Sequence, residues 1–317
     1  MPKISVIIPV YGVEQYIERC ARSLFEQTFD DMEYIFVNDC TPDRSMDVLN
    51  SVVLAYPERA GQVKIVNLPE NGGLPNARRQ GLKHASGDYI AHCDSDDWMD
   101  LSAFEKMYAS ALANDADIVY ADFYRGDGNT QVYKSRQVDV TSASSALYSI
   151  TRSVMWSLCG TIIRRSLYER PEVTFPSHNN GEDFALMFQL AYNAKSLAWV
   201  NEPLYYYYYN PASMSTSRSE DSYIKRYTEL KANTELVISF LNAKGDSRKF
   251  KDLIACYKMF CRTKLSPLTG NKKYRKMWLE TYPELGIMDI VANKVIPFST
   301  VLNFITVKLG VYHLINK

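Results

Sequence analysis

The sequence predicts an α/β fold: a doubly wound, mostly parallel sheet with a C-terminal helical extension. Short apolar runs alternate with amphipathic helical segments through the first 125 residues. Such strand–helix–strand alternation is typical of a parallel sheet with helices on both faces. Beyond Ser213 the pattern changes to amphipathic helices rich in Lys, Arg and Tyr, which predicts a separate helical region.

The apolar runs define the expected strands. They are residues 4–10, 33–39, 63–69, 88–94 and 116–124. The first three runs are almost continuously apolar, so we expect parallel strands covered on both faces. Between them, residues 16–25 and 46–54 place apolar side chains at helical spacing.

After residue 126 the alternation weakens. A turn at 126–129 is followed by a polar strand candidate at 131–138, helical patterns at 143–152 and 182–195, and strand structure at 197–210. The tail predicts helices at about 220–243, 247–265 and 272–282, then a mostly apolar segment, 287–316, interrupted by Pro297. We therefore expect two domains, residues 1–216 and 217–317.

Composition excludes several classes of protein. The chain has 317 residues, 46% hydrophobic and 23% charged, which is an ordinary globular composition rather than that of a disordered chain. No apolar run is long enough for a spanning helix, and the N-terminal run is too short for a secretion signal, so we expect a cytoplasmic protein. The six cysteines have no C-x-x-C spacing, which predicts reduced, mostly buried thiols.

The zero net charge conceals an asymmetry between the two regions. Residues 1–216 carry 18 Lys and Arg against 27 Asp and Glu, whereas residues 217–317 carry 18 against 9. The tail's excess of nine positive charges predicts an anionic partner. That partner is either the acidic body of the same chain or a membrane surface; no nucleic-acid-binding motif accompanies the basic residues.

Chemistry in a doubly wound sheet is expected at the carboxyl ends of the strands. The first strand is followed by neither a dinucleotide-binding glycine motif nor a P-loop. The second ends in Asn38-Asp39, where a carboxylate suits a base N–H or a ribose hydroxyl, although a turn or helix cap explains it equally well. The third leads to Gly72-Gly73 with Arg78 one turn into a helix, which suits a phosphate or base but also an ordinary turn with a solvated arginine.

The strongest signal is Asp94-Ser95-Asp96-Asp97 at the end of the fourth strand. Clustered carboxylates repel one another unless a cation or a donor neutralises them, and hard oxygen ligands favour Mg²⁺ or Mn²⁺. A structural calcium site or a solvated turn is the alternative. His92 on the same strand is expected to be a packed core residue. Further along, Glu182-Asp183 open a helix, where one carboxylate can serve as a base or both can simply cap the helix.

Together these motifs resemble glycosyltransferase family 2, whose members have the A-type glycosyltransferase fold. The matching segments are ISVIIPVYG at 4–12, VNDCTPDRS at 37–45, the stretch Asn71 to Gly81, the D-x-D-D signature at 94–97 and the pair Glu182-Asp183. The resemblance covers about residues 1–215, and the five motifs follow the family's order.

The resemblance implies a role for each matched residue. It implies nucleotide contacts from Pro9, Val10, Tyr11, Asp39, Asn71, Gly72, Arg78, Asp94 and Ser95. Asp96 would bind a Mn²⁺ or Mg²⁺ ion that bridges the diphosphate, and Asp183 would be the catalytic base. Glu182 and Trp156 would contact the acceptor. The family's W-N-K-L-Y-R-R segment appears here as Trp156 to Arg165 without the lysine, so the acceptor's identity is not implied.

The resemblance thus implies a metal-dependent, inverting hexosyltransferase that moves a sugar from a nucleoside-diphosphate sugar, by family habit a UDP-sugar, to a hydroxyl of a saccharide or lipid-linked saccharide in surface polysaccharide synthesis. The alternative is a catalytically silent homologue that acts as a partner subunit of a polysaccharide synthase complex. The basic, apolar tail resembles an interfacial anchor and predicts a peripheral location on the inner face of the membrane. The competing interpretation is a helical subdomain packed on the body. The tyrosines at 205–209 are expected to alternate between core and surface, with sugar stacking as the alternative.

Overall fold

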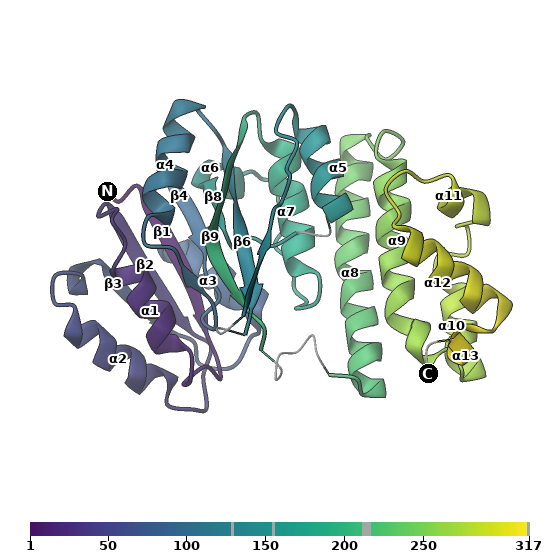
Figure 1. Ribbon diagram of the computed structural model, residues 1–317, viewed down its shortest axis with the longest axis horizontal. Coiled ribbons are helices and arrows are strands. Elements are labelled where there is room, and N and C mark those ends of the chain that lie inside the picture. Colours follow the sequence, from purple (N-terminus) through teal and green to yellow (C-terminus); the bar gives the residue numbers. More distant parts are fainter. Residues whose placement is uncertain (128–129, 154–155, 211–216, 316–317) are drawn as a thin grey trace. The chain divides into compact units, whose positions relative to one another are not determined.

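The computed structural model describes residues 1–127, 130–153, 156–210 and 217–315. These form two compact units, Met1–Ser177 with Leu186–Pro211, and His178–Ala185 with Ala212–Lys317. The first unit contains the sheet and the second is helical (Figure 1). The expected division into domains 1–216 and 217–317 stays a prediction.

Among the described residues the sheet unit contains one nine-stranded sheet. Its strands are β1 (Ile4–Val10), β2 (Met32–Asn38), β3 (Val63–Asn67), β4 (Tyr89–His92), β5 (Trp98–Met99), β6 (Ile118–Gly126), β7 (Gln131–Lys134), β8 (Thr161–Arg164) and β9 (Leu197–Tyr208). The strand order is β3-β2-β1-β4-β8-β6-β9-β5, and β7 pairs with β6. Strands β1 to β4 are mutually parallel, as are β6 and β9, whereas β5, β7 and β8 run against their neighbours.

Alternation along β1 explains why helices cover both faces of the sheet. Even-numbered side chains from Ile4 to Val10 join a hydrophobic core with residues of α1, α2 and α4. Ile7 points the other way, and a Cβ on Gly81 of α3 would lie 2.5 Å from its Cγ2. The glycine therefore permits close approach of α3 to the second face, and the predicted doubly wound, mostly parallel fold is confirmed.

The remaining elements of the sheet unit are helices. They are α1 (Ile17–Phe25), α2 (Ser45–Ala55), a 3-10 turn (Ala60–Gln62), α3 (Leu74–His84), α4 (Ala103–Ala113), α5 (Ala143–Ser153), α6 (Arg165–Tyr168) and the end of α7 (Glu182–Asn193). Figure 1 shows α1 and α2 running beside the strands at the β3 end of the sheet.

The sequence-based interpretation is wrong about the environment of the third strand. β3 is the edge of the sheet, and its residues are exposed or half-buried rather than covered on both faces. Lys64, the second residue of β3, pairs with Glu33 of β2 at 2.6 Å, and a charged side chain is a common device for protecting an edge strand. The polar strand expected at 131–138 is also shorter, since β7 ends at Lys134.

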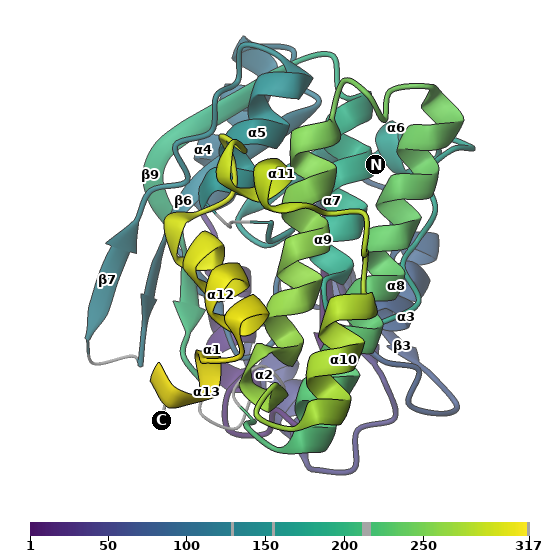
Figure 2. The ribbon, with the colours of Figure 1, turned by 90° about the vertical axis from the view of Figure 1, so that its right-hand side faces the viewer.

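The helical unit contains α8 (Glu220–Lys244), α9 (Lys251–Leu265), a 3-10 turn (Ser266–Leu268), α10 (Lys272–Glu280), α11 (Ile287–Val291), α12 (Phe298–Leu309) and α13 (Tyr312–Ile315). Local signals set the ends of the longest helix. The Ser219 hydroxyl accepts a hydrogen bond from the Ser222 N–H at 3.2 Å, and Gly245 ends α8 at a φ of 75°. Helices α8 and α9 lie side by side (Figures 1 and 2).

Aromatic contacts form the core of the helical unit. The rings of Phe184 and Tyr257 lie 4.4 Å apart, and those of Trp278 and Phe304 lie 5.5 Å apart. Buried Arg262 lies over Trp278 and donates to the carbonyls of Thr281 and Tyr282, which ties α9 to the segment after α10. Across the described part of the chain, no helix is both long and apolar enough to cross a bilayer.

Candidate functional site

The carboxyl ends of β1 and β2 form the first wall of the predicted nucleotide pocket. Pro9 and Val10 are buried, whereas Tyr11 is exposed just beyond the strand. The Val10 carbonyl accepts a hydrogen bond from the Asp39 N–H at 3.0 Å, which joins the two strand ends. Gly12, at a φ of 68°, donates its N–H to the Thr41 hydroxyl at 2.9 Å. The two loops that follow β1 and β2 are therefore fixed to each other.

Asp39 holds the glycine loop that opens α3. Its two carboxylate oxygens accept the backbone N–H groups of Gly72 and Gly73, at 2.8 and 2.9 Å. Burial raises the pKa of the Asp39 carboxyl, and the two N–H donors oppose this shift. The turn that was the alternative explanation is made instead by Asn38, whose side chain accepts the Thr41 N–H at 2.9 Å. Asn71 and Gly72 are both exposed beside this carboxylate.

Arg78 of α3 is fully buried, so the interpretation of this residue as a solvated arginine is wrong. Its guanidinium donates to an Asp94 carboxylate oxygen at 2.7 Å. The pair links the glycine loop of α3 to the acidic segment after β4, and it brings the predicted nucleotide contacts Asp39, Gly72, Arg78 and Asp94 into one connected group.

Replacing Arg78 by methionine is expected to lower the free energy of unfolding by about 2–4 kcal/mol, because the Asp94 carboxylate then loses its buried cationic partner. Arg79→Met is the matched control, since Arg79 is the next residue of the same helix and is exposed. Its effect should stay within about 0.5 kcal/mol. Urea unfolding monitored by circular dichroism measures both values, and equal losses in the two variants would contradict the structural role of the Arg78–Asp94 pair.

The carboxylates of the D-x-D-D segment have different partners. Buried Asp97 accepts hydrogen bonds from the Tyr205 hydroxyl and from the Tyr208 N–H, the latter at 2.7 Å. Among the described residues, the Asn210 amide donates a long hydrogen bond to Asp96, at 3.4 Å, and the Arg19 charge adds weaker stabilisation. Asp97 therefore attaches the segment to the end of β9, whereas Asp96 is left with little protein stabilisation of its charge.

The electrostatics of the segment follow from this arrangement. Burial raises the pKa of Asp96 to about 6, and the neighbouring Asp94 charge adds to the shift. Burial and the charges of Asp96 and Asp94 also raise the pKa of Asp97 well above its ordinary value. Among the described residues, no three His, Cys, Asp or Glu side chains converge as a ready-made metal site. Arg78 pairs with Asp94, and Asp97 has two hydrogen-bond donors, so Asp96 is the least supported carboxylate of the segment.

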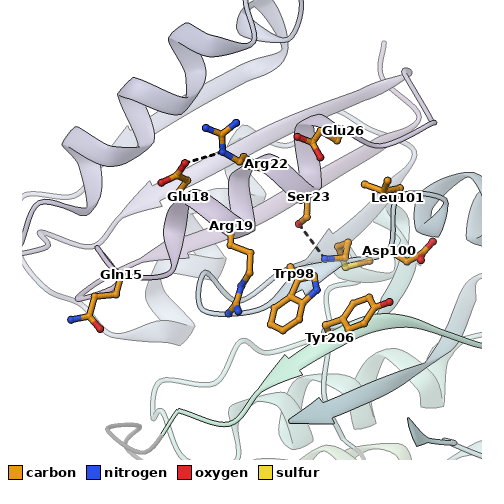
Figure 3. Close-up of a pocket in the computed structure, with 11 residues that line it drawn as sticks. Gln15, Glu18, Arg19, Arg22, Ser23, Glu26, Trp98, Asp100, Leu101 and Tyr206 are labelled. Carbon is orange, nitrogen blue, oxygen red and sulfur yellow. Dashed lines mark hydrogen bonds and ion pairs between the residues drawn. The ribbon is translucent and has the colours of Figure 1, made fainter. Parts of the chain in front are cut away.

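Helix α1 supports the acidic segment from the side. Arg19 donates to the Asp96 carbonyl at 2.9 Å and lies over the Trp98 ring at 3.7 Å. Trp98 in turn stacks on Tyr206 with centroids 5.1 Å apart. These side chains line a groove of about 580 Å³ along α1, shown in Figure 3. None of the predicted site residues lines it, so we interpret the groove as a by-product of this support.

Of the remaining predicted residues in this unit, Ser95 and Trp156 are both buried. Near Trp156, the Arg136 guanidinium donates to the carbonyls of Ser157 and Cys159. Arg136 thus stabilises the backbone of the segment in which the family's lysine is missing. His92 is buried, its Nε2 is 3.0 Å from the Tyr168 hydroxyl, and burial holds its pKa well below the ordinary value, so the prediction of a core histidine is confirmed.

Glu182 and Asp183 open α7 in the helical unit rather than in the sheet unit. Glu182 is buried and Asp183 is half-buried. The preceding turn is held by α8, where the Asn233 amide donates to the carbonyls of His178 and Asn180, at 2.9 and 2.8 Å. The structure thus fixes the first turn of α7 within its own unit, and the catalytic role of Asp183 stays a prediction.

Sequence analysis missed the supporting residues Arg19, Tyr205, Tyr208 and Asn210. The five-tyrosine run was a usable signal, because it contains both core and surface residues, as predicted: Tyr205 is buried and Tyr207 is exposed. The predicted alternation is wrong, since these two positions share a strand face and burial instead decreases toward the end of β9. Tyr207 is 37% exposed, and partial burial of its phenol together with the charges of Asp97, Asp94 and Asp96 raises its pKa to about 12. Arg125 of β6 lies over the same ring at 5.6 Å.

Comparison with known proteins agrees with this architecture. Residues 5–181 match the profile described as glycosyl transferase family 2. The uncharacterized glycosyltransferase EpsJ of Bacillus subtilis is 29% identical over 282 residues, which cover 86% of this chain and 78% of EpsJ. The match spans more than half of the chain and includes both the strand ends and the acidic segment. The protein belongs to glycosyltransferase family 2.

Solved structures share the fold. TarS 1–349 of Staphylococcus aureus, crystallised with UDP-GlcNAc, superposes with a TM-score of 0.63 at 18% identity, over 97% of this chain and 91% of that one. A mannosyltransferase of Pyrobaculum calidifontis, in complex with GDP-Man and Mn²⁺, gives a TM-score of 0.58 at 14% identity, over 98% and 87%. These likenesses confirm the A-type glycosyltransferase fold.

Proposed function

We propose that this protein transfers a sugar, with inversion, from a UDP-sugar to a hydroxyl of a saccharide or lipid-linked saccharide acceptor. The observation that carries the proposal is the connected group at the carboxyl ends of β1, β2 and β4. There Asp39 holds the glycine loop, Arg78 holds Asp94, and Asp96 accepts a long hydrogen bond from Asn210. Such strand ends are where doubly wound sheets bind nucleotides.

The donor's nucleoside would lie over Pro9, Val10 and Tyr11. The Asp39 carboxylate uses one lone pair on each oxygen for the glycine loop, and a carboxylate offers about four acceptor positions. Asp39 can therefore still accept an N–H from a base. Asn71, Gly72 and Ser95 would complete the nucleotide contacts. UDP is proposed because TarS, which shares the fold, was crystallised with UDP-GlcNAc.

The acidic segment fits a divalent cation. Asp96 is the carboxylate whose charge the protein stabilises least, and burial beside Asp94 has raised its pKa. A hard cation such as Mn²⁺ or Mg²⁺ would relieve this cost, with Asp96 as the protein ligand and diphosphate oxygens among the others. The mannosyltransferase with the same fold was crystallised with Mn²⁺. When bound, the cation would offset negative charge on the leaving diphosphate.

The chain's own residues would supply the proton transfer. Asp183 would accept the proton of the acceptor hydroxyl as its oxygen forms a bond to the anomeric carbon. The bond from that carbon to the diphosphate breaks on the opposite face, so the configuration inverts and the nucleoside diphosphate leaves. Glu182 and Trp156 would hold the acceptor. We also propose a role in surface polysaccharide synthesis, at the inner face of the membrane.

Calorimetric titration with UDP, GDP and dTDP, each with and without Mn²⁺, tests the donor proposal. We expect one nucleotide to bind with micromolar affinity and at least about tenfold more tightly with Mn²⁺, because the cation joins two anionic groups. Binding without release of nucleotide from any UDP-sugar and acceptor mixture would favour the silent-homologue alternative. Absence of binding for all three nucleotides would overturn the proposal.

A further inference from the structure

Helix α12 has apolar side chains on two of its faces. Phe304 and Val307 on one face are buried in the core of the helical unit. Phe298, Leu302, Ile305 and Leu309 are spaced by four, three and four residues, so they share another face. Phe298 is 80% exposed and Leu309 is 70% exposed. The helix is therefore both a packing element and the carrier of an exposed apolar stripe.

The neighbouring helices extend this stripe. Ile287, Met288 and Val291 of α11 are exposed, and so is Leu314 of α13. Both α11 and α12 pack on α9, and α12 contacts α13. Figures 1 and 2 show the three helices along one side of the helical unit. We call the exposed apolar side chains of α11, α12 and α13 the apolar face. Single exposed apolar residues are ordinary, but seven large apolar side chains exposed within residues 287–314 are a concentration typical of an interaction surface.

The charges around the apolar face are mostly positive. Lys294 lies in the connection between α11 and α12, Lys308 lies near the end of α12, and both are exposed. The one acid in residues 286–315, Asp289, accepts the Gly286 N–H at 2.9 Å and so caps α11. The run Lys272-Lys273-Tyr274-Arg275-Lys276 adds four cationic side chains at the start of α10.

We propose that the apolar face, α11 to α13, is a membrane-docking surface that binds an anionic lipid bilayer. Exposed Phe and Leu side chains next to lysines are the combination that interfacial helices use to insert shallowly among acidic headgroups. A second copy of this chain fits less well, because it would bring the same lysines against each other with only Asp289 to pair with them. The surface is separate from the nucleotide site and does not depend on the proposed reaction.

Flotation with vesicles of phosphatidylcholine and phosphatidylglycerol at a ratio of 7:3, without nucleotide, tests the proposal on the full chain. We expect wild type to float with these anionic vesicles and to stay in the lower fraction when the vesicles contain phosphatidylcholine alone. Phe298→Ser with Leu309→Ser should weaken vesicle binding about tenfold or more, because two large apolar side chains no longer leave water. Lys294→Gln with Lys308→Gln should weaken it several-fold, and more so at low salt.

A matched control distinguishes docking through the apolar face from non-specific hydrophobic binding. Leu54 of α2 and Leu112 of α4 are 82% and 64% exposed in the sheet unit, so Leu54→Ser with Leu112→Ser removes a similar apolar area from helical positions. This variant should bind vesicles like wild type, and all variants should keep the wild-type melting temperature.

Three outcomes would overturn the proposal. The first is that wild type does not bind the anionic vesicles. The second is that the control and test variants lose vesicle binding equally. The third is a lipid-free dimer, detected by light scattering, that only Phe298→Ser with Leu309→Ser dissociates, because the occupant would then be a second copy. Nucleotide binding is measured separately, so failure of this proposal leaves the proposed donor and reaction untouched and bears only on the proposed location at the membrane.

Discussion

Asp96→Ala is expected to abolish metal-dependent nucleotide binding, with a loss of about 100-fold or more in affinity at saturating Mn²⁺. Asp96 is the carboxylate of the acidic segment with the fewest protein donors, and it lies beside Asp94 and buried Asp97. Its removal would leave the cation without its proposed protein ligand, and the bridge between protein and diphosphate is worth several kcal/mol. Calorimetry with the nucleotide that binds wild type, with and without Mn²⁺, measures the loss.

Two further variants make this result specific. Asp96→Asn keeps the size of the side chain and removes its charge, so it should behave like Asp96→Ala if charge is what matters. Asp47→Ala removes an exposed carboxylate that pairs with Arg44 at 3.7 Å, and it should bind as wild type does. Wild-type nucleotide affinity in Asp96→Ala would exclude Asp96 as a ligand of the metal. If the variant also lost the nucleotide binding that does not need Mn²⁺, the D-x-D-D segment would be structurally disrupted.

The central strands were predictable because burial on both faces of the sheet requires an apolar residue at almost every position. β1 and β2 are covered on both faces, so their sequences are almost wholly apolar. β3 has a similar sequence, but its position at the edge of the sheet depends on strand order, which no local pattern encodes. β5 is two residues long and forms because β9 pairs with Trp98 and Met99. The residues that define this strand therefore lie more than 100 positions further along the chain, where a local sequence pattern does not reach.

The residues of the candidate site were predictable from local sequence, whereas the contacts between them were not. Asp39, Arg78 and Asp94 were found because each lies at a strand end or a helix start, where residue type and spacing are informative. Their connection was not predictable, since Arg78 looks like any helical arginine until its burial against Asp94 is known. Asp97 was grouped with repelling carboxylates, yet Tyr205 and Tyr208 supply its donors from 108 and 111 residues further along.

The tail presented two competing interpretations, a packed subdomain and an interfacial anchor. The structure explains why the sequence could not choose between them. In α12, apolar residues on two faces give an almost continuous apolar run, and periodicity alone does not separate the buried face of Phe304 from the exposed face of Phe298. Packing within the helical unit is therefore observed on the face of Phe304, whereas packing on the catalytic body stays a prediction and docking of the second face on a bilayer stays our proposal.

Asp183→Asn is expected to preserve donor binding and to lower the rate of transfer by about 10²- to 10⁴-fold, the usual contribution of a general base. Asparagine has nearly the same shape and can still cap the first turn of α7, so the turn held by Asn233 should survive. Only the ability to accept a proton is removed. Nucleotide affinity within about twofold of wild type, together with a lowered kcat at saturating donor, would assign Asp183 to the chemical step.

Asp221→Asn provides the matched control, because Asp221 is also an acid in the first turn of a helix of the same unit and is exposed. It should leave kcat unchanged. A near-normal rate in Asp183→Asn would exclude Asp183 as the base. Equal losses in donor affinity and rate would instead indicate a structural role for the first turn of α7. Because the Asp96 variants lose metal-dependent binding and Asp183→Asn should lose turnover alone, the two sets of measurements separate the donor site from the catalytic base even if one assignment fails.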